Sequence, residues 1–143
     1  MGLQRIIVPL GIALVVAAGC GAPYEPEDPS KPVVNVAHAR SAAEFQRLVL
    51  EAKTPVFVDF TAVWCGPCQK MAPVLNALAP QYEGKVAVVK VDVDVVPQAA
   101  AQFGVQNLPT FLVFRSGKVV KRLVGSMSQS RLRGALDDAA GGK

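Results

Sequence analysis

The chain has 143 residues, a formal net charge of +4 and a hydrophobic fraction of 51%. This length suits one domain with a sizeable core. Its 15 basic residues are scattered, without the cluster or the interleaved aromatic side chains that a nucleic-acid surface requires, and no internal repeat is present. We therefore expect a single folded domain with no nucleic-acid partner.

An apolar segment near the N-terminus indicates export. Residues 6–18 form an apolar run of 13 residues, interrupted only by Pro9 and Gly11. A membrane-spanning helix needs about 20 residues, so the run instead fits the apolar region of a secretory signal peptide. Removal of residues 1–19 would take away Arg5 and no acidic residue, which lowers the positive charge only slightly.

The residues at the end of this segment, Ala-Ala-Gly-Cys at 17–20, resemble a bacterial lipobox. In that motif, cleavage leaves a lipidated cysteine at the new N-terminus, here Cys20. Ala17 stands where a large aliphatic residue is usual. The alternative is an ordinary signal peptide cut near Gly19 or Ala22, which would leave Cys20 as a free thiol in an oxidising compartment. Lipidation would use up that sulfur, so we favour it.

A proline-rich stretch follows Cys20. Residues 21–32 contain four prolines and three acidic residues and almost no apolar side chains. This composition predicts a semi-extended tether between a membrane surface and the domain. The expected organisation is a signal peptide at 1–19, a lipidated cysteine and tether at 20–32, and a folded domain at 33–143.

The domain is predicted to alternate strands and helices. The apolar run at 55–60 is nearly continuous, as in a strand covered on both faces. Ser41, followed three residues later by Glu44, predicts a capped helix start. The expected strands are 33–36, 55–60, 85–93, 110–114 and 118–124; the expected helices are 41–52, one from the motif below to about 82, 97–103 and 128–139.

The most informative motif is Trp-Cys-Gly-Pro-Cys at 64–68. Cysteines three apart at the start of a helix lie close enough to form a disulfide. The helix N-terminus carries unpaired N–H groups and a partial positive charge, so Cys65 should have a lowered thiol pKa and act as the nucleophile. We expect Cys65 to be the exposed thiol, whereas Cys68, one turn further on, should be buried and react second. Pro67 suits the first turn, where its missing N–H costs nothing.

Two other interpretations of the cysteine pair are a structural disulfide and half of a zinc site. A structural zinc ion needs four ligands. The only other candidate ligands, Cys20 and His38, both precede the predicted core. We therefore expect a redox pair and no metal site.

Several separated motifs in the same order resemble the thioredoxin family. They are Val58-Asp59-Phe60, the 64–68 motif, Met71-Ala72-Pro73 and Leu108-Pro109-Thr110, and the resemblance extends from about Val33 to Ala139. It implies an α/β domain with the thioredoxin fold, in which helices flank a mixed central β-sheet on both faces.

The resemblance also assigns acid–base roles. Asp59 lies in an apolar strand, where burial should raise the pKa of its carboxyl group. In thioredoxins the matching aspartate lies beneath the buried cysteine and helps to move its proton. The alternative is an edge-strand aspartate that faces solvent. Lys90 lies in another largely apolar strand, and the resemblance places it near Asp59, although a solvated lysine is the simpler interpretation.

The substrate contacts are assigned by the resemblance as well. Pro109 matches the cis proline that faces the disulfide, and the backbone of Leu108 would pair with an extended substrate chain. The alternative is a proline that merely begins a strand. Trp64 should flank the nucleophile and pack on substrate, the alternative being a core tryptophan. Gly66 and Pro67 complete the expected contact surface.

Two positions near this surface depart from the family pattern. Thr61 replaces a usual tryptophan, and Asn107 replaces a common glycine. Both departures concern the choice of partner rather than the chemistry.

Together these features predict a monomeric, membrane-anchored thiol-disulfide oxidoreductase outside the cytoplasm of a bacterium, with no bound cofactor. Gly66-Pro67 is typical of reducing family members, so we expect reduction of protein disulfides, with electrons from a membrane donor protein. The alternatives are a thiol oxidase or isomerase that uses the same pair, a redox-inert binding module, and a soluble secreted form.

Overall fold

The computed structural model describes residues 36–141. Five strands form one mixed sheet in the order β1-β3-β2-β4-β5. Strands β1, β3 and β2 are parallel, and β4 and β5 run antiparallel to their neighbours. The strands are β1 (Val36–Ala39), β2 (Val56–Thr61), β3 (Ala87–Asp92), β4 (Thr110–Arg115) and β5 (Lys118–Val124).

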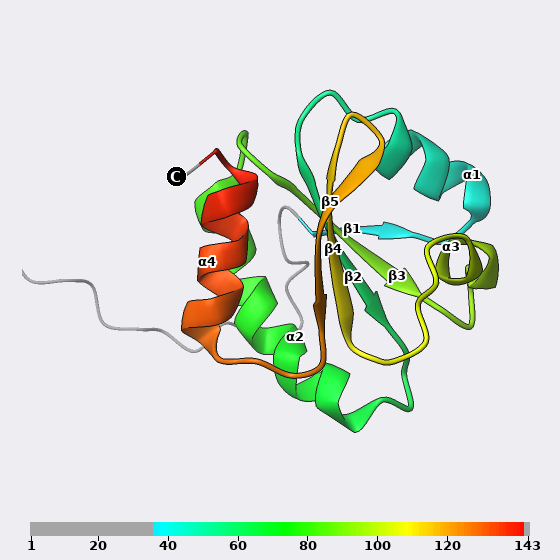
Figure 1. Ribbon diagram of the computed structural model, residues 1–143. Coiled ribbons are helices and arrows are strands. Elements are labelled where there is room, and N and C mark those ends of the chain that lie inside the picture. The colour runs from blue at the N-terminus through cyan, green and yellow to red at the C-terminus, as the bar shows by residue number, and fades with distance from the viewer. Residues whose placement is uncertain (1–35, 142–143) are drawn as a thin grey trace, which may run out of the picture. The chain divides into compact units, whose positions relative to one another are not determined.

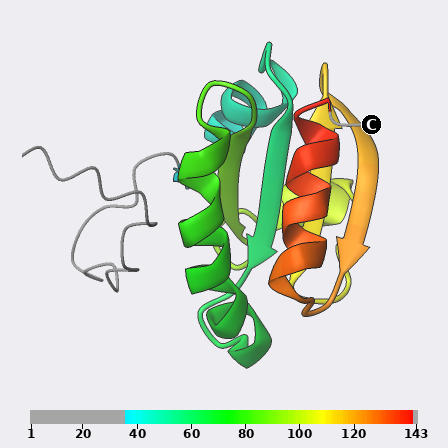
Figure 2. The same ribbon diagram turned by 90° about the vertical axis from the view of Figure 1, so that its left-hand side faces the viewer.

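Helices cover both faces of this sheet. Figure 1 shows the sheet nearly edge-on, with α2 and α4 on one face and α1 and α3 on the other, and Figure 2 looks onto the face with α2 and α4. The helices are α1 (Ala42–Phe45), which continues as the π-helix Gln46–Leu50; α2 (Gly66–Leu78), which continues as the 3-10 helix Ala79–Tyr82; α3 (Pro97–Gln102); and α4 (Gln129–Ala139). The predicted thioredoxin-type α/β architecture is therefore confirmed.

Alternation along β2 divides the core into two layers. Phe57 packs with Leu75 of α2 and Leu132 of α4 in one cluster, while Phe60 packs with Phe45 in the other. Because side chains alternate along a strand, Asp59 lies on the same face as Phe57, the face that α2 covers. The sheet thus places one carboxyl group inside the α2-side layer.

The first strand lies further along the chain than the apolar content suggested. It was expected at 33–36, but β1 is Val36–Ala39, because these four residues pair with Val88–Val91 of β3. Residues 33–35 lie outside the described range, as do the predicted signal peptide, Cys20 and the tether. None of the helices within residues 36–141 is long and apolar enough to cross a membrane.

Candidate active site

The cysteine pair lies where β2 passes into α2. Cys65 and Cys68 form a disulfide with a Cα–Cα distance of 5.2 Å. Cys65 is the N-cap of α2, so the helix begins directly after it, at Gly66, and Pro67 lies in the first turn as expected. A proline is tolerated there because the first N–H groups of a helix have no partner within the helix.

At the N-terminus of α2 a backbone hydrogen bond distinguishes the two sulfur atoms. The backbone N–H of Cys68 donates a hydrogen bond to Sγ of Cys65 over 3.2 Å. A hydrogen-bond donor and the positive end of the helix both favour negative charge on a sulfur atom. After reduction, this geometry favours the thiolate at Cys65, which is the position that the sequence assigned to the nucleophile.

The two cysteines are not distinguished by burial in the disulfide form. Cys65 is 5% exposed and Cys68 is 3% exposed, and the two form one buried cluster with Ala62. The expectation that Cys65 is exposed is therefore wrong for this form, since Cys65 belongs to a buried cluster against which Val93 and Leu108 pack. The structural difference between the cysteines lies in hydrogen bonding.

Asp59 is buried on β2, the central strand of the sheet. It is 4% exposed, and its Oδ1 has no hydrogen-bond partner among the described residues. Burial raises the pKa of Asp59 from 3.8 to about 6, against the opposing effect of Lys90. β2 lies between β3 and β4, so the interpretation as a solvent-facing edge residue is wrong. A carboxyl group with this pKa can accept and return a proton near neutral pH.

Lys90 is the neighbour of Asp59 across the β2–β3 pair, in register with it. It is half-buried, and its Nζ donates a hydrogen bond to Oδ1 of Asn76 on α2 over 3.2 Å. Burial lowers the pKa of the Lys90 ammonium group, and Asp59 partly opposes this effect. The predicted proximity of Lys90 and Asp59 is confirmed, whereas Asn76 was not foreseen.

A surface pocket of about 490 Å³ reaches the second cysteine. Cys68 lines it together with Gln69 of α2, and Lys90 and Asp92 of β3 form its polar wall. His38 also lines the pocket from β1, in register with Lys90. His38 therefore belongs to the folded sheet; the view that it precedes the core is wrong because β1 begins two residues before it.

His38 lies among positive charges. Burial lowers the pKa of its imidazole, and Lys90 and Arg40 lower it further. Within residues 36–141, no group of three or more histidine, cysteine, aspartate or glutamate side chains is arranged to hold a metal ion.

The loop before β4 brings Leu108 and Pro109 to the disulfide. The Leu108–Pro109 peptide bond is cis, as the resemblance implied. Leu108 packs against the cluster that contains both cysteines, and Oγ1 of Thr110 donates a hydrogen bond to the carbonyl oxygen of Asn107 over 2.7 Å. The loop therefore lies beside the redox pair, with Asn107 as part of its internal hydrogen bonding.

Trp64 stands outside the core. Its side chain is 67% exposed, so the interpretation as a core tryptophan is wrong. The indole Nε1–H donates a hydrogen bond to Oδ2 of Asp94 over 2.7 Å. Val63 beside it is 75% exposed. Asp94 was not foreseen, because it lies 30 residues along the chain from Trp64.

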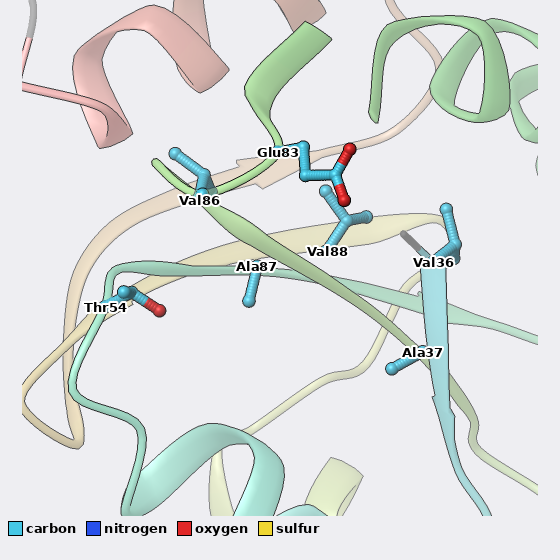
Figure 3. Close-up of a pocket in the computed structure, with 8 residues that line it drawn as sticks. Val36, Ala37, Thr54, Glu83, Val86, Ala87 and Val88 are labelled. Carbon is cyan, nitrogen blue, oxygen red and sulfur yellow. The ribbon is translucent and has the colours of Figure 1, made fainter. Parts of the chain in front are cut away.

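A second pocket, of about 420 Å³, lies at the other end of the parallel strands. Figure 3 shows it between the start of β1, the start of β3 and Thr54 before β2, with Glu83 at its edge. The remaining lining is mostly apolar, and no cysteine or histidine is present. The chemistry therefore lies at the carboxyl ends of β2 and β3, where α/β sheets commonly bind their substrates.

Comparisons with known proteins agree with this site. The thioredoxin family model matches residues 36–138. Thioredoxin 1 of Nostoc sp. is 45% identical over 93 residues, which cover 65% of this chain and 87% of that protein. Thioredoxin 1 of Synechococcus elongatus is 43% identical over 104 residues, covering 73% and 97%, and thioredoxin C-2 of Corynebacterium nephridii is 46% identical over 93 residues, covering 65% and 86%. The chain therefore belongs to the thioredoxin family and is a thiol-disulfide oxidoreductase.

Proposed function

We propose that this protein reduces disulfides of other proteins outside the cytoplasm, while a lipid on Cys20 holds it to a membrane. The observation that carries the reductase chemistry is Cys65 at the N-terminus of α2, with its Sγ accepting the Cys68 amide. The export and the anchor rest on the sequence at residues 1–32.

The first step forms a mixed disulfide. The Cys65 thiolate attacks one sulfur of the substrate disulfide, a new S–S bond forms, and the other substrate sulfur leaves as a thiolate that takes up a proton. The exposed Trp64 precedes Cys65 in the chain, and Leu108 packs against the cysteine cluster. An extended substrate chain that pairs with the backbone of the Leu108–Pro109 loop would be held with its disulfide near Cys65.

The second step releases the substrate. Asp59 accepts the proton of the Cys68 thiol, directly or through water in the adjoining pocket. The Cys68 thiolate then attacks Sγ of Cys65, and the S–S bond between Cys65 and the substrate breaks. The second substrate sulfur leaves as a thiolate that takes up a proton, and the protein keeps the Cys65–Cys68 disulfide. Lys90 favours the charged form of Asp59. Its position in register with Asp59 supports this role.

A reductant must then return two electrons and two protons to the cysteine pair. For a protein held at a membrane surface, a membrane protein that carries a dithiol is the fitting class of donor. No bound cofactor takes part in either step.

The test of the reductase direction is the reduction of insulin disulfides with dithiothreitol as the donor. The protein should accelerate the reaction, and the Cys65→Ser variant should not. A redox-inert binding module would give no acceleration with either protein. The reduction potential of the Cys65–Cys68 pair against glutathione separates a reductase from an oxidase, because an oxidase would have a potential well above that of reducing thioredoxins.

A further inference from the structure

The indole of Trp64 is hydrogen-bonded to the turn after β3. Trp64 is the single tryptophan of the chain and precedes the nucleophilic cysteine. An exposed aromatic side chain is free to change rotamer unless a partner holds it. The partner here is Asp94, whose Oδ2 accepts the indole N–H over 2.7 Å.

Asp94 is held in turn by Asp92, the last residue of β3. Oδ1 of Asp92 accepts the backbone N–H of Asp94 over 2.9 Å. The carbonyl oxygen of Asp92 accepts the N–H groups of Val95 and Val96, over 3.1 and 2.9 Å. Asp92 therefore closes the turn with its side chain and its backbone together.

This turn is also fixed to the end of β2. The N–H of Val93 donates to the carbonyl oxygen of Thr61 over 3.0 Å, and Thr61 pairs with Asp92 in the β2–β3 register. Asp92 further lines the pocket that reaches Cys68. One side chain thus lies between the pocket beside the second cysteine and the turn that holds Trp64.

We propose that Asp92 is a positioning residue, which acts through Asp94 to hold the Trp64 indole in the orientation that a substrate chain meets beside Cys65. The carboxylate of Asp92 makes no hydrogen bond to Trp64 or to either sulfur among the described residues. By holding the turn, Asp92 lowers the entropy that the Trp64 side chain loses when a substrate binds. The inference rests on the proposed reductase function, but its principal measurement does not need activity.

The predicted consequence is a change in substrate binding rather than in chemistry. In Asp92→Ala the Asp94 N–H loses its side-chain acceptor, the turn gains freedom, and the indole is held less firmly. Substrate binding must then order this side chain, so KM for insulin should rise by about threefold to tenfold, the factor for one immobilised side chain. The value of kcat should stay within about twofold, because Cys65, Cys68 and Asp59 are untouched.

The experiment compares Asp92→Ala with Asp92→Asn and with a control, Glu83→Ala. Asn keeps an oxygen that can accept the Asp94 N–H, so it should restore the parent behaviour. Glu83→Ala makes the same charge change beside the pocket at the other end of the strands. The readouts are the fluorescence anisotropy of Trp64, the KM and kcat of insulin reduction, and thermal unfolding.

Of Asp92→Ala, Asp92→Asn and Glu83→Ala, only Asp92→Ala should show a lower Trp64 anisotropy and a raised KM. Asp94→Ala should reproduce both changes, and the double variant should add little to either single one, since the two residues act in series. Unchanged anisotropy in a folded Asp92→Ala protein would overturn the proposal, and so would an Asp92→Asn protein as impaired as Asp92→Ala. A loss of thermal stability without a fluorescence change would assign Asp92 a purely structural role.

A measurement on the unaltered protein covers the case in which Asp92→Ala does not fold. The backbone amide hydrogen of Asp94 should exchange with solvent more slowly than other amides in surface turns, because it is donated to the Asp92 carboxylate. Exchange as fast as that of an unbonded amide would contradict the proposal. If the unaltered protein fails to reduce insulin, the proposed function fails, while anisotropy and amide exchange still decide the role of Asp92.

Discussion

The two cysteines differ in their hydrogen bonds although both are buried. Sγ of Cys65 accepts an N–H at the helix terminus, while Cys68 lies one turn inside α2. Cys65 should therefore attack substrate, and Cys68 should resolve the mixed disulfide. We expect Cys68→Ser to accumulate covalent complexes with a disulfide substrate, and Cys65→Ser to accumulate none.

Non-reducing electrophoresis followed by mass spectrometry measures these complexes. The double serine variant is the control for non-covalent association. Complexes that form through Cys68 in the Cys65→Ser protein would reverse the assignment of the nucleophile.

Asp59 should make stability depend on pH. Its pKa rises from 3.8 in the unfolded chain to about 6 in the folded protein because of burial. The folded state then binds the proton more tightly, so the free energy of unfolding should fall as the pH rises from about 4 to about 6 and stay level above that. The shift corresponds to roughly 3 kcal/mol of lost stability at pH 8.

The Asp59→Asn variant tests this dependence because it has the same shape and no charge to desolvate. The difference in the free energy of unfolding between the variant and the parent protein should grow in favour of the variant as the pH rises from 4 to 7, as measured by urea denaturation at each pH. The turnover of the variant should fall. Parallel stability curves for the two proteins would show that burial of the carboxylate carries no such cost. Unchanged turnover would remove Asp59 from the proton transfer.

Sequence reasoning found those residues of the site that belong to short motifs of neighbouring residues. The cysteine pair, Asp59 and Pro109 each lie in a short motif, and the structure places them as the motifs indicated. Asn76 and Asp94 were missed because each acts through a hydrogen bond to a partner 14 or 30 residues away along the chain. A single sequence carries no spacing rule for such contacts.

At the scale of the elements, the buried strands were the easiest to predict. The expected 55–60 and β2 differ by one residue at each end, because an apolar run bounded by turn residues marks a central strand clearly. The edge strand β1 was misplaced because its extent is set by pairing with β3, and apolar content does not reveal a register. The predicted helix at 41–52 is shorter in the structure, since it changes to a π-helix after Phe45 and ends at Leu50.

The β4–β5 turn packs tightly against the end of this π-helix. Gly117 has φ of +73°, and a Cβ atom there would lie 2.7 Å from the carbonyl oxygen of Leu50. Gly117→Ala should therefore lose stability twice, by about 1 kcal/mol for the left-handed backbone and by about 2 kcal/mol for the overlap.

Gly84→Ala is the matched control for the backbone effect. Gly84 has nearly the same φ, +75°, but no atom lies within 4 Å of the added Cβ position. It should lose only about 1 kcal/mol in urea denaturation. Equal losses in the two variants would show that the turn moves away from Leu50 at no cost.

At the scale of the whole molecule, the order of the strands brings the parts of the site together. The cysteine loop and the Asp92 turn follow the carboxyl ends of the parallel strands β2 and β3. Because β4 is antiparallel to β2, the cis-proline loop before β4 lies at the same end of the sheet. Cys65 and Leu108 thus lie in one packed group although their motifs are far apart and independent in the sequence. The resemblance to a family predicted this convergence; periodicity alone did not.

The proposed anchor should restrict the protein to substrates near a membrane. With Cys20 lipidated, the 12 residues from Gly21 to Pro32 would form the tether. As a proline-rich chain it would reach about 37 Å at roughly 3.1 Å per residue. The tether would therefore keep the redox pair close to the surface and raise its effective concentration toward substrates held there.

Cys20→Ser tests this restriction. Mass spectrometry of the mature parent protein should find diacylglyceryl on Cys20, and the variant should lose it and leave the membrane fraction. Insulin reduction in solution should be equal for the two proteins, because every residue of the active site lies within residues 36–141 and residue 20 is not among them. Reduction of a disulfide peptide fixed to vesicles should be faster with the lipidated protein by a factor that falls as the tether is lengthened. An unmodified N-terminus in a freely soluble parent protein would reject the anchor and leave a secreted oxidoreductase whose substrates are not confined to a surface.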